Sequence, residues 1–444
     1  MIYLPEEVNT ALKLLNNAGY EAYIVGGCVR DSLLGTVPKD YDITTSALPL
    51  QTEDVFKGYR VIETGIKHGT VTVLINGMPL EITTYRIDSE YEDCRRPTSV
   101  SFTKSLEEDT ARRDFTMNAI AYNPACGIAD HHSGAEDIKK GIIRCVGIPD
   151  ERFTEDALRI MRAIRFSSVL GFDVENETKK SLFKNKALLD KISRERIASE
   201  FIKLLCGKDV FRVLTEYDEI IAQIIPEVSP MFDFDQHSRY HIYNVWEHTA
   251  KVCESVDNTP VLRLAAFFHD IGKPHCFTMK NCEGHFYGHA SISEDICRTV
   301  LTSLKLDNKT KDTVTQLVKL HDVQIEQTPA AVKKFMSRRS PELYYMLLKL
   351  KRADTLGQNP MVFDRLEMLD NMKAIADEVL SQEACFSLKD LKINGNDIMT
   401  LGVRPGKAVG RTLQILLDKV MAGEIENDRE KLIACAKDMI SIDN

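Results

Sequence analysis

The order of hydrophobic and polar positions divides the chain into an α/β part and a helical part. In residues 1–150 short β-rich runs alternate with helical stretches, whereas beyond about residue 150 apolar residues recur at helical spacing. The runs TVTVLING and PLEITTYRI alternate well, and the Asn76-Gly77 pair between them is a strong hairpin signal. The stretch FTEDALRIMRAIRFSSVLG predicts a helix that stops at Gly171. We therefore expect an α/β head followed by an all-helical body.

Composition narrows the class of protein. The chain has 444 residues, and its 43% hydrophobic and 28% charged residues are ordinary for a globular protein of several domains. No apolar run reaches the roughly 18 residues that a membrane span needs, and the N-terminus lacks the pattern of a secretion signal. The 11 cysteines form no CxxC pair, so a disulfide framework or a zinc ribbon is not expected. These features predict a cytoplasmic protein with no membrane partner.

A turn between a predicted strand and a predicted helix, IVGGCVRDSLLG, has the residues of a phosphate-binding loop. Gly26 and Gly27 let the backbone approach a phosphate closely, and the N-terminus of the helix, which runs from near Cys28 to Gly35, offers free N–H groups. Arg30 lies one turn into this helix and adds a charged donor fork. A Gly-Gly pair alone is also typical of an ordinary tight turn.

Two carboxylates follow in KDYDITT, which is predicted to be a strand. Positions i and i+2 of a strand share a face, so Asp40 and Asp42 would lie side by side. Such a pair is unfavourable unless a cation lies between the charges, and Mg²⁺ binds one or two carboxylates together with substrate phosphates. Two such ions can stabilise the attacking and leaving oxygens of an in-line displacement. Glu81, in LEITTYR, is a candidate third carboxylate, with an exposed strand residue as the alternative.

Several segments together resemble the class II tRNA nucleotidyltransferases. They are GGCVRDSLLGTVPKDYDI, EITTYRID, RRPTSVSFTKSLEEDTARRDFTMNAIAY and EDALRIMRAIRF, and they occur in the order that this family has them. The family comprises the CCA-adding enzymes of the polymerase-β-like nucleotidyltransferase superfamily, which also includes bacterial poly(A) polymerases. The resemblance implies an α+β fold, with a small mixed-sheet nucleotidyltransferase head and then an all-helical neck, body and tail. It also implies CTP, ATP and tRNA as substrates and Mg²⁺ as cofactor.

Asp156 and Arg159 have the chemistry to select a nucleobase. They lie three residues apart on a predicted helix and therefore on one face. An Asp accepts hydrogen bonds and an Arg donates them, which complements the amino donor and ring-nitrogen acceptor that cytosine and adenine share. Uracil and guanine would place a carbonyl oxygen against the carboxylate. In the family these positions act as an amino-acid template.

Further arginines follow nearby. Arg162 and Arg165 continue the three-residue spacing and, with Arg112 and Arg113, supply positive charge for a triphosphate or an RNA phosphate. A solvated helix face is the alternative for Arg162 and Arg165. The resemblance implies that Arg112 touches the nucleotide, and the two aspartates of DTARRD are placed to orient these arginines or to cap a helix. Because the net charge is −9, we expect a narrow basic track along head and neck rather than a broad patch.

The segment from Arg86 to Asp109 is polar and rich in charge, which predicts a long mobile loop. In the family a flexible loop at this place helps to switch specificity from C to A. An ordinary disordered loop is the alternative. The charged residues that this chain has there are Glu90, Asp93, Arg95 and Arg96.

Eight of the 11 histidines lie in residues 237–321. His248, the pair His269-Asp270 and Asp354 occur in the order H…HD…D, which is the signature of HD-domain metal phosphohydrolases. Such residues can close an octahedral site for Ni, Mn, Mg or Fe. The resemblance implies phosphatase, 2′,3′-cyclic phosphodiesterase or 2′-nucleotidase chemistry. A module that has lost its activity and only binds RNA is the alternative.

Two further histidines lie close to this series in the sequence. His289 and the pair His321-Asp322 are placed to ligate a second ion or to bind phosphate. The sequence leaves these two roles open.

The resulting division of the chain has four parts. They are a nucleotidyltransferase head (1–150), a helical neck with the base-selecting motif (151–228), an HD metal-binding body (229–370) and a helical tRNA-binding tail (371–444). The leading prediction is two-metal, template-independent addition of C, C and A to tRNA. The alternatives are a CC-only, A-only or poly(A) nucleotidyltransferase, an HD phosphohydrolase acting on RNA 3′ ends or nucleotides, and a non-catalytic tRNA chaperone. The oligomeric state stays open.

Overall fold

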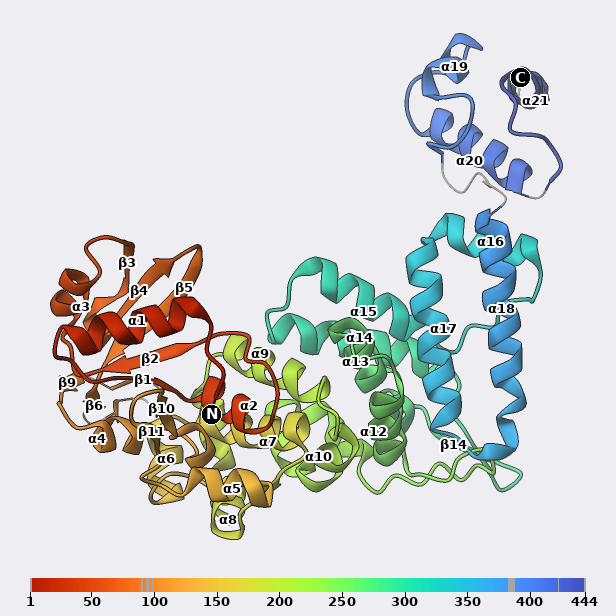
Figure 1. Ribbon diagram of the computed structural model, residues 1–444. Helices are drawn as coiled ribbons and strands as arrows, with labels where there is room; N and C mark the ends of the chain where they lie inside the picture. The colour runs from red at the N-terminus through yellow and green to blue at the C-terminus, as the bar shows by residue number, and fades with distance from the viewer. Residues whose placement is uncertain are drawn as a thin grey trace. The chain divides into compact units, whose positions relative to one another are not determined.

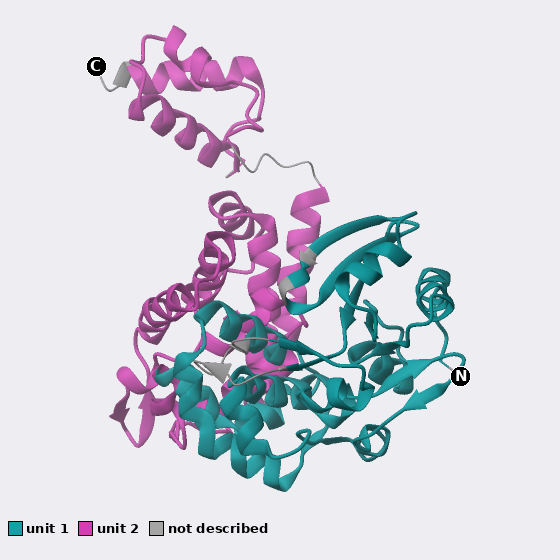
Figure 2. Ribbon diagram, turned by 90° about the vertical axis from the view of Figure 1, so that its left-hand side faces the viewer, with its two compact units in different colours: residues 1–226 teal, residues 227–444 magenta. Residues whose placement is uncertain are grey.

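The computed structural model describes residues 2–88, 91–92, 96–97, 100–381, 388–421 and 423–442. Strands and helices alternate in the first part of the chain, and helices follow in the rest (Figure 1). The chain forms two compact units, residues 1–226 with the main β-sheet and residues 227–444, which are almost entirely helical (Figure 2). No helix in the described segments is long and apolar enough to cross a membrane. The predicted α+β class is confirmed, whereas the four-part division of the chain stays a prediction.

A seven-stranded mixed sheet forms the centre of the head, with the strand order β11-β10-β1-β2-β5-β4-β3. Strands β2 and β5 pair in parallel, and the other neighbours pair antiparallel. Helices α1 (Glu6–Asn17), α2 (Gly27–Leu33) and α3 (Pro49–Val55) pack against the strands. The strands are β1 (Ala22–Val25), β2 (Asp42–Thr45), β3 (Arg60–Gly65), β4 (Thr70–Ile75), β5 (Met78–Thr84), β10 (Ala121–Asn123) and β11 (Gly127–Ala129).

The β4–β5 hairpin shows how the sequence builds this sheet. Its turn is Asn76-Gly77, both with positive φ, as the pattern predicts. Leu80 and Ile82 of β5 are buried, whereas Glu81 between them is exposed. The alternation of apolar and polar residues therefore places the Glu81 carboxylate on the solvent-accessible face of the strand.

The segment from Arg86 to Asp109 differs from its prediction as one long loop. Its described residues form two short antiparallel pairs, β6 (Arg86–Asp88) with β9 (Val100–Phe102) and β7 (Tyr91–Glu92) with β8 (Arg96–Pro97), followed by helix α4 (Leu106–Ala111). The charged residues hide the strand signal in the sequence, although Ile87, Val100 and Phe102 have high β-propensity. Glu90, Asp93 and Arg95 lie outside the described residues, and the specificity role of this segment stays a prediction.

Helices complete the first unit after the strand-like segments end. The helix expected across the EDALR motif is in fact two helices, α6 (Pro149–Glu155) and α7 (Leu158–Leu170), interrupted at Asp156. Helix α7 ends at Gly171, whose φ of 67° is left-handed, as predicted. The other elements are α5 (Gly134–Lys140), the β12 (Ile142–Ile143) and β13 (Asp173–Val174) pair, α8 (Asn176–Asn185), α9 (Arg194–Leu205), α10 (Val210–Glu216) and α11 (Asp218–Ile224).

The second unit begins with a bundle of helices and one short hairpin, β14 (Thr278–Lys280) with β15 (Glu283–His285). Helix α12 begins with a capping box in which Asn244 and Glu247 bond to each other's backbone N–H. Helix α17 begins with the Ser340 cap followed by Pro341. The helices are α12 (Val245–Ser255), α13 (Pro260–Phe268), α14 (His289–Ser303), α15 (Asn308–Leu320), α16 (Pro329–Arg338), α17 (Pro341–Leu356) and α18 (Asp364–Ser381).

The last helices have an apolar core of their own. Ile398 of α19 (Gly395–Thr400), Leu416 of α20 (Lys407–Met421) and Leu432 of α21 (Arg429–Ile442) are fully buried members of this core. Burial of one such side chain stabilises a fold by roughly 1.5–3 kcal/mol. The tail is therefore a packed helical element rather than a loose extension.

Candidate active site

Three carboxylates of the head lie around one end of β2. Asp42 is the first residue of this strand, and the parallel register places it opposite Glu81 of β5. Asp40 lies just before the strand, in irregular backbone, whereas a strand across both residues was predicted. The prediction of a strand across both residues was wrong because pairing with β1 begins only at Ile43.

The Asp42 carboxylate has a pKa raised above its usual value. Partial burial is the largest cause, Arg113 opposes it, and the negative charges of Asp40 and Glu81 raise it further. The three acids are therefore close enough to repel one another. Among the described residues, sets of three or more His, Cys, Asp or Glu ligand atoms that all lie within 4.8 Å of one another occur only in the second unit. The carboxylate oxygens of Asp40, Asp42 and Glu81 are therefore not all within 4.8 Å of one another.

The glycine turn lies beside the same end of the sheet. Gly26 has a φ of 83°, and its N–H donates to the Ile120 carbonyl at 3.2 Å. A Cβ on Gly26 would lie 3.1 Å from Nη1 of Arg113. Gly27 begins α2, as predicted. Gly26 is therefore required both by the backbone conformation and by the close approach of Arg113.

We expect Gly26→Ala to lower stability by about 1 kcal/mol, because alanine is strained at positive φ, and also to slow nucleotide addition. Gly19→Ala is the matched control, since Gly19 has a φ of 88° but nothing within 4 Å of an added Cβ. Thermal unfolding and primer extension would be measured for both variants. Equal loss of activity in the two variants would contradict a role for the contact with Arg113.

Asp109 of α4 holds two arginines of the DTARRD motif. Its carboxylate is fully buried and accepts from Nε of Arg112 at 3.0 Å and from the Thr44 hydroxyl at 2.9 Å. Arg113 lies 3.7 Å from one of the carboxylate oxygens. Burial raises the pKa of Asp109, but the charges of Arg112 and Arg113 outweigh it and hold the pKa below its usual value. Asp109 therefore fixes both guanidinium groups beside β2.

Asp114, the other aspartate of this motif, anchors Arg162 of α7. It accepts from Nε of Arg162 at 2.7 Å and from the Asn118 amide at 3.0 Å. Burial opposes ionisation, but Arg162 and Asn118 outweigh it and lower the pKa of Asp114 to about 2. Arg162 is therefore an anchored charge and not a solvated helix residue.

The depressed pKa makes the stability pH-dependent. The charged Asp114 contributes about 2 kcal/mol at pH values above its unfolded pKa of about 3.8, and this contribution disappears as the pH falls through about 2. We expect Asp114→Asn to destabilise the protein by about 2–3 kcal/mol at pH 7, because Arg162 is left half-buried without its counter-charge. Urea unfolding from pH 7 down to pH 3 would show the difference shrinking. Asp54→Asn, at an exposed position, should show no such change.

Three arginines surround the ring of Phe166. The guanidinium carbon atoms of Arg30, Arg162 and Arg165 lie 4.9, 5.5 and 3.7 Å from its centroid. The buried ring attracts these cations through its π-face. Arg165 also forms a 2.7 Å ion pair with Glu200, so the alternative of a solvated helix face does not hold for it.

The start of α2 is tied to the rest of the head through Arg30. Its guanidinium donates to Asp31 at 2.7 Å and to the side-chain amide oxygen of Asn118 at 2.7 Å. Asn118 is buried and links Arg30 with the Asp114–Arg162 pair. No pattern in the sequence predicted this role of Asn118; its spacing of four from Asp114 was the available hint.

Asp156 and Arg159 do not share one helix face. Asp156 ends α6 with an extended backbone, and its carboxylate accepts from the Leu158 N–H at 3.1 Å, which starts α7. Its other oxygen accepts from Arg196 of α9 at 3.0 Å. Arg159 is buried and donates instead to Glu155 at 2.7 Å. The one-helix prediction was wrong because an Asp at a helix boundary competes for backbone N–H groups.

Arg159 also ties the neck to the head. Its Nη2 donates to the Arg112 carbonyl at 2.8 Å, and its Nη1 to the Arg152 carbonyl at 3.1 Å. Arg196, which holds Asp156, was not among the residues predicted from the sequence. It lies 40 residues further along the chain, and only the tertiary packing of α7 on α9 relates the two.

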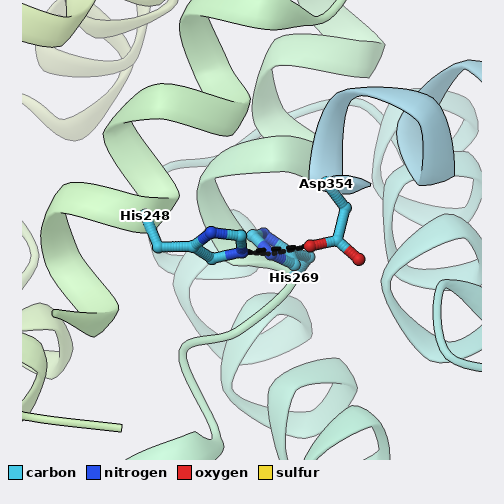
Figure 3. A group of neighbouring side chains, drawn as sticks. All are labelled: His248, His269 and Asp354. Carbon is cyan, nitrogen blue, oxygen red and sulfur yellow. Dashed lines mark hydrogen bonds and ion pairs between the residues drawn. The ribbon is translucent and has the colours of Figure 1, made fainter. Parts of the chain in front are cut away.

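The HD signature residues meet in the second unit. His248 of α12, His269 after α13 and Asp354 of α17 point toward one centre (Figure 3). The two histidine Nε2 atoms lie 3.3 Å apart, and Nε2 of His248 lies 3.0 Å from Asp354. Asp270 contributes an oxygen 3.1 Å from Nε2 of His269. All four predicted ligands therefore gather, and they are buried or nearly so.

A second donor group adjoins the first. His289 at the start of α14 and His321 after α15 lie with their Nε2 atoms 3.0 Å apart, and Asp270 completes the group. Asp322, which the sequence placed beside His321, is exposed and belongs to neither group. It points elsewhere because the residue after His321 leaves the helix toward solvent.

The chain matches known proteins along its length. Residues 22–144 match the family model of the poly(A) polymerase head domain, residues 171–232 that of the probable RNA and SrmB-binding site of polymerase A, and residues 285–436 that of tRNA nucleotidyltransferase domain 2. A CCA-adding enzyme of Ligilactobacillus salivarius is 34% identical over 98% of both chains. The chain belongs to the CCA-adding enzyme family. Another member, from Latilactobacillus sakei, is 36% identical over 98% of this chain and 99% of its own.

Solved structures of CCA-adding enzymes share this fold. The Bacillus stearothermophilus CCA-adding enzyme in complex with CTP is similar with a TM-score of 0.77 and 30% identity over 98% of each chain. The Thermotoga maritima CCA-adding enzyme complexed with tRNA has a TM-score of 0.58 and 19% identity over 98% of this chain and 96% of its own. At that identity the second likeness shows the fold alone.

Proposed function

We propose that this tRNA nucleotidyltransferase adds C, C and A to the 3′ end of tRNA from CTP and ATP and releases pyrophosphate. The observation that carries the proposal is the register that places Asp42 opposite Glu81, next to Arg113 and the Gly26 turn. Relatives that match the chain from end to end are CCA-adding enzymes. The complex of the Bacillus stearothermophilus enzyme with CTP supports CTP as a substrate.

In the proposed reaction the tRNA 3′-hydroxyl oxygen attacks the α-phosphorus of CTP or ATP. A new P–O bond forms and the hydroxyl proton passes to solvent, while the bond from the α-phosphorus to the bridging oxygen breaks and pyrophosphate leaves with the electron pair. Two Mg²⁺ ions, when bound, lower the hydroxyl's pKa and neutralise the developing charge. Asp40, Asp42 and Glu81 fit this role as oxygen donors, since their mutual repulsion calls for a cation.

Anchored arginines are proposed to hold the triphosphate. Arg112 is fixed by Asp109, and Arg30 by Asp31 and Asn118. Guanidinium groups fixed in this way can meet phosphate oxygens without a large loss of conformational freedom. Gly26 and Gly27 are proposed to let the backbone approach the same phosphates.

Base selection is proposed to depend on Asp156 and Arg159 with help from Arg196. Arg196 orients the Asp156 carboxylate, while Arg159 is fixed by Glu155 and by the Arg112 carbonyl. An acceptor and a donor held in this way complement cytosine and adenine and oppose the carbonyl oxygen of uracil or guanine. Arg162 and Arg165 are proposed to complete the nucleotide site as positive charges around Phe166.

The test uses purified protein with Mg²⁺ and three tRNA transcripts, which end before CCA, after C and after CC. CTP and ATP are supplied separately and together, and the products are sized at single-nucleotide resolution. The proposal predicts completion to CCA on all three transcripts and then arrest. Addition of only one nucleotide type would make the chain a CC-only or A-only relative, and continued addition of A would make it a poly(A) polymerase.

A second activity is proposed for the HD residues, namely hydrolysis of phosphate esters at RNA 3′ ends or on nucleotides. The supporting observation is the convergence of His248, His269, Asp270 and Asp354. Such a donor set suits Ni, Mn, Mg or Fe. Release of phosphate from 2′,3′-cyclic or 3′-phosphorylated RNA ends is expected with the wild type but not with His269→Ala. No release with any of these metals would leave the module as a binding element.

A further inference from the structure

The β14–β15 hairpin carries a pair of stacked rings close to the HD residues in the chain. The rings of His285 and Tyr287 have their centroids 5.4 Å apart and their planes at 7° to each other. Tyr287 is 71% exposed, and it precedes His289 of the second donor group by only two residues. The two rings therefore offer an open stacking surface next to the metal-ligating residues.

The hairpin is held against the segment that leads into helix α12. The Gly284 N–H donates to the His237 carbonyl at 2.9 Å. A Cβ on Gly284 would lie 2.2 Å from the Gln236 carbonyl oxygen, so this close approach requires glycine. Phe286, between the two stacked residues, packs on Phe277 with ring centroids 5.6 Å apart. The packing of its own strand therefore fixes the stacked pair in place.

Two arginines lie against a third ring, that of Tyr240. The guanidinium carbon atoms of Arg239 and Arg365 are 4.9 and 5.9 Å from its centroid, and both side chains are exposed. Arg365 donates to Oε1 of Gln358 at 3.2 Å. The Gln358 amide in turn donates to Asp354 of the first donor group at 3.1 Å. One of the two arginines is therefore a single side chain away from a metal-ligating carboxylate.

Arg239 connects the arginines with the hairpin. Its Nε lies 3.9 Å from the carboxylate of Glu283, the first residue of β15. Because Arg239 is 65% exposed and the distance is long, this ion pair is weak and leaves the guanidinium group accessible to a phosphate. Lys280, opposite Glu283 in the hairpin, is exposed and adds a further positive charge. Cations and stacked rings therefore form one continuous surface.

We propose that this surface binds the single-stranded 3′ end of an RNA and directs its terminal phosphate to the HD residues. Exposed rings stack on bases of any identity, and guanidinium groups bind the backbone phosphates. A free nucleotide would use only part of the surface. The inference rests on the proposed hydrolysis of phosphate esters, and it names RNA ends rather than nucleotides as the substrate. The residues of the surface are Arg239, Tyr240, His285, Tyr287 and Arg365.

The test places a fluorescent reporter on the surface, in full-length Tyr287→Trp loaded with Mn²⁺. An RNA of about six nucleotides with a 3′-phosphate is added in stopped flow, and the fluorescence is read before turnover. The other tryptophan, Trp246, is buried, and RNA bound at the head lies outside the reach of the reporter. We expect saturable quenching by stacked bases, with an affinity at least about tenfold higher than that of adenosine 3′-phosphate.

The matched control is Met279→Trp, which lies on the same hairpin, is exposed, and has its side chain on the opposite face from His285. It should show no quenching. Replacing both Arg239 and Arg365 with Gln in the Tyr287→Trp protein should weaken RNA binding about tenfold and remove the preference for a 3′-phosphate over a 3′-hydroxyl end. Lys373→Gln, at an exposed position further along α18, should change neither.

Three results would overturn the proposal: no quenching in Tyr287→Trp, equal quenching in Met279→Trp, or equal affinity for adenosine 3′-phosphate and the RNA. Should Tyr287→Trp fail to fold by circular dichroism, a 4-thiouridine next to the RNA 3′ end decides in the wild type. A crosslink within residues 283–287 would support the proposal, and its absence would overturn it. Phosphate release is measured in parallel, and its absence would refute the proposed hydrolysis without changing the binding result.

Discussion

Asp42→Ala is expected to reduce the rate of nucleotide addition by at least about 10³-fold, equivalent to about 4 kcal/mol of transition-state stabilisation. The reason is that Asp42 begins β2 directly opposite Glu81, at the point where the proposed metal ions must be held. Affinity for tRNA should change by less than about threefold, since the arginines that can meet phosphates are untouched. Single-turnover rates at saturating CTP and tRNA binding would be measured side by side.

The control for this prediction is Asp54→Ala, which removes an exposed carboxylate of α3 whose partner is Lys57. It should leave the rate unchanged. Glu81→Gln resolves whether the third carboxylate takes part: a metal ligand predicts a loss of about 10-fold or more, and an ordinary exposed strand residue predicts none. Retention of activity within about tenfold by Asp42→Ala would exclude the proposed catalytic site.

Asp156→Ala is expected to lower discrimination against UTP and GTP by about 10²-fold. A binding site that forms a hydrogen bond to its substrate strongly rejects a substrate that cannot form this bond. The rejection is lost when the side chain that forms the bond is removed. The ratio of kcat/KM for CTP over UTP, measured on tRNA ending before CCA, gives the effect directly.

Arg196 provides a graded control for base selection. It orients Asp156 through a 3.0 Å ion pair and lies outside the motif that contains Asp156 and Arg159. Arg196→Ala should reduce discrimination less than Asp156→Ala does, and Arg196→Lys should restore part of it. Unchanged discrimination in Asp156→Ala would show that another group reads the base.

The sequence predicted correctly those turns and helix ends that depend on the backbone preferences of a few neighbouring residues. The Asn76-Gly77 hairpin, the turn that begins α2 and the helix end at Gly171 all follow from backbone preferences that are visible in the sequence. The interruption of the neck helix at Asp156 was missed, because helical spacing of apolar residues continues across it. The β6–β9 pairing was missed because the charged residues of this segment obscure the strand pattern in the sequence. The pairing itself is made by backbone groups, which the sequence does not show.

Long-range partners could not be derived from a single sequence. The order H…HD…D predicted that His248, His269 and Asp354 lie together, but the grouping of Asp270 with His289 and His321 depends on the positions of helices α12 to α17. In the same way, Asp114 with Arg162 and Asp156 with Arg196 are distant in the chain and are brought together by packing. The sequence shows which residues carry a charge, whereas the partner of each charged side chain depends on the folded structure.

The most direct test of the central claim supplies all four nucleoside triphosphates together, at equal concentrations, to tRNA lacking its 3′ end. Sequencing of the extended 3′ ends then shows which bases the protein chooses without a nucleic-acid template. We predict ends that read CCA and stop there. Ends containing U or G, or runs beyond the third nucleotide, would contradict base selection by the side chains of the head and neck.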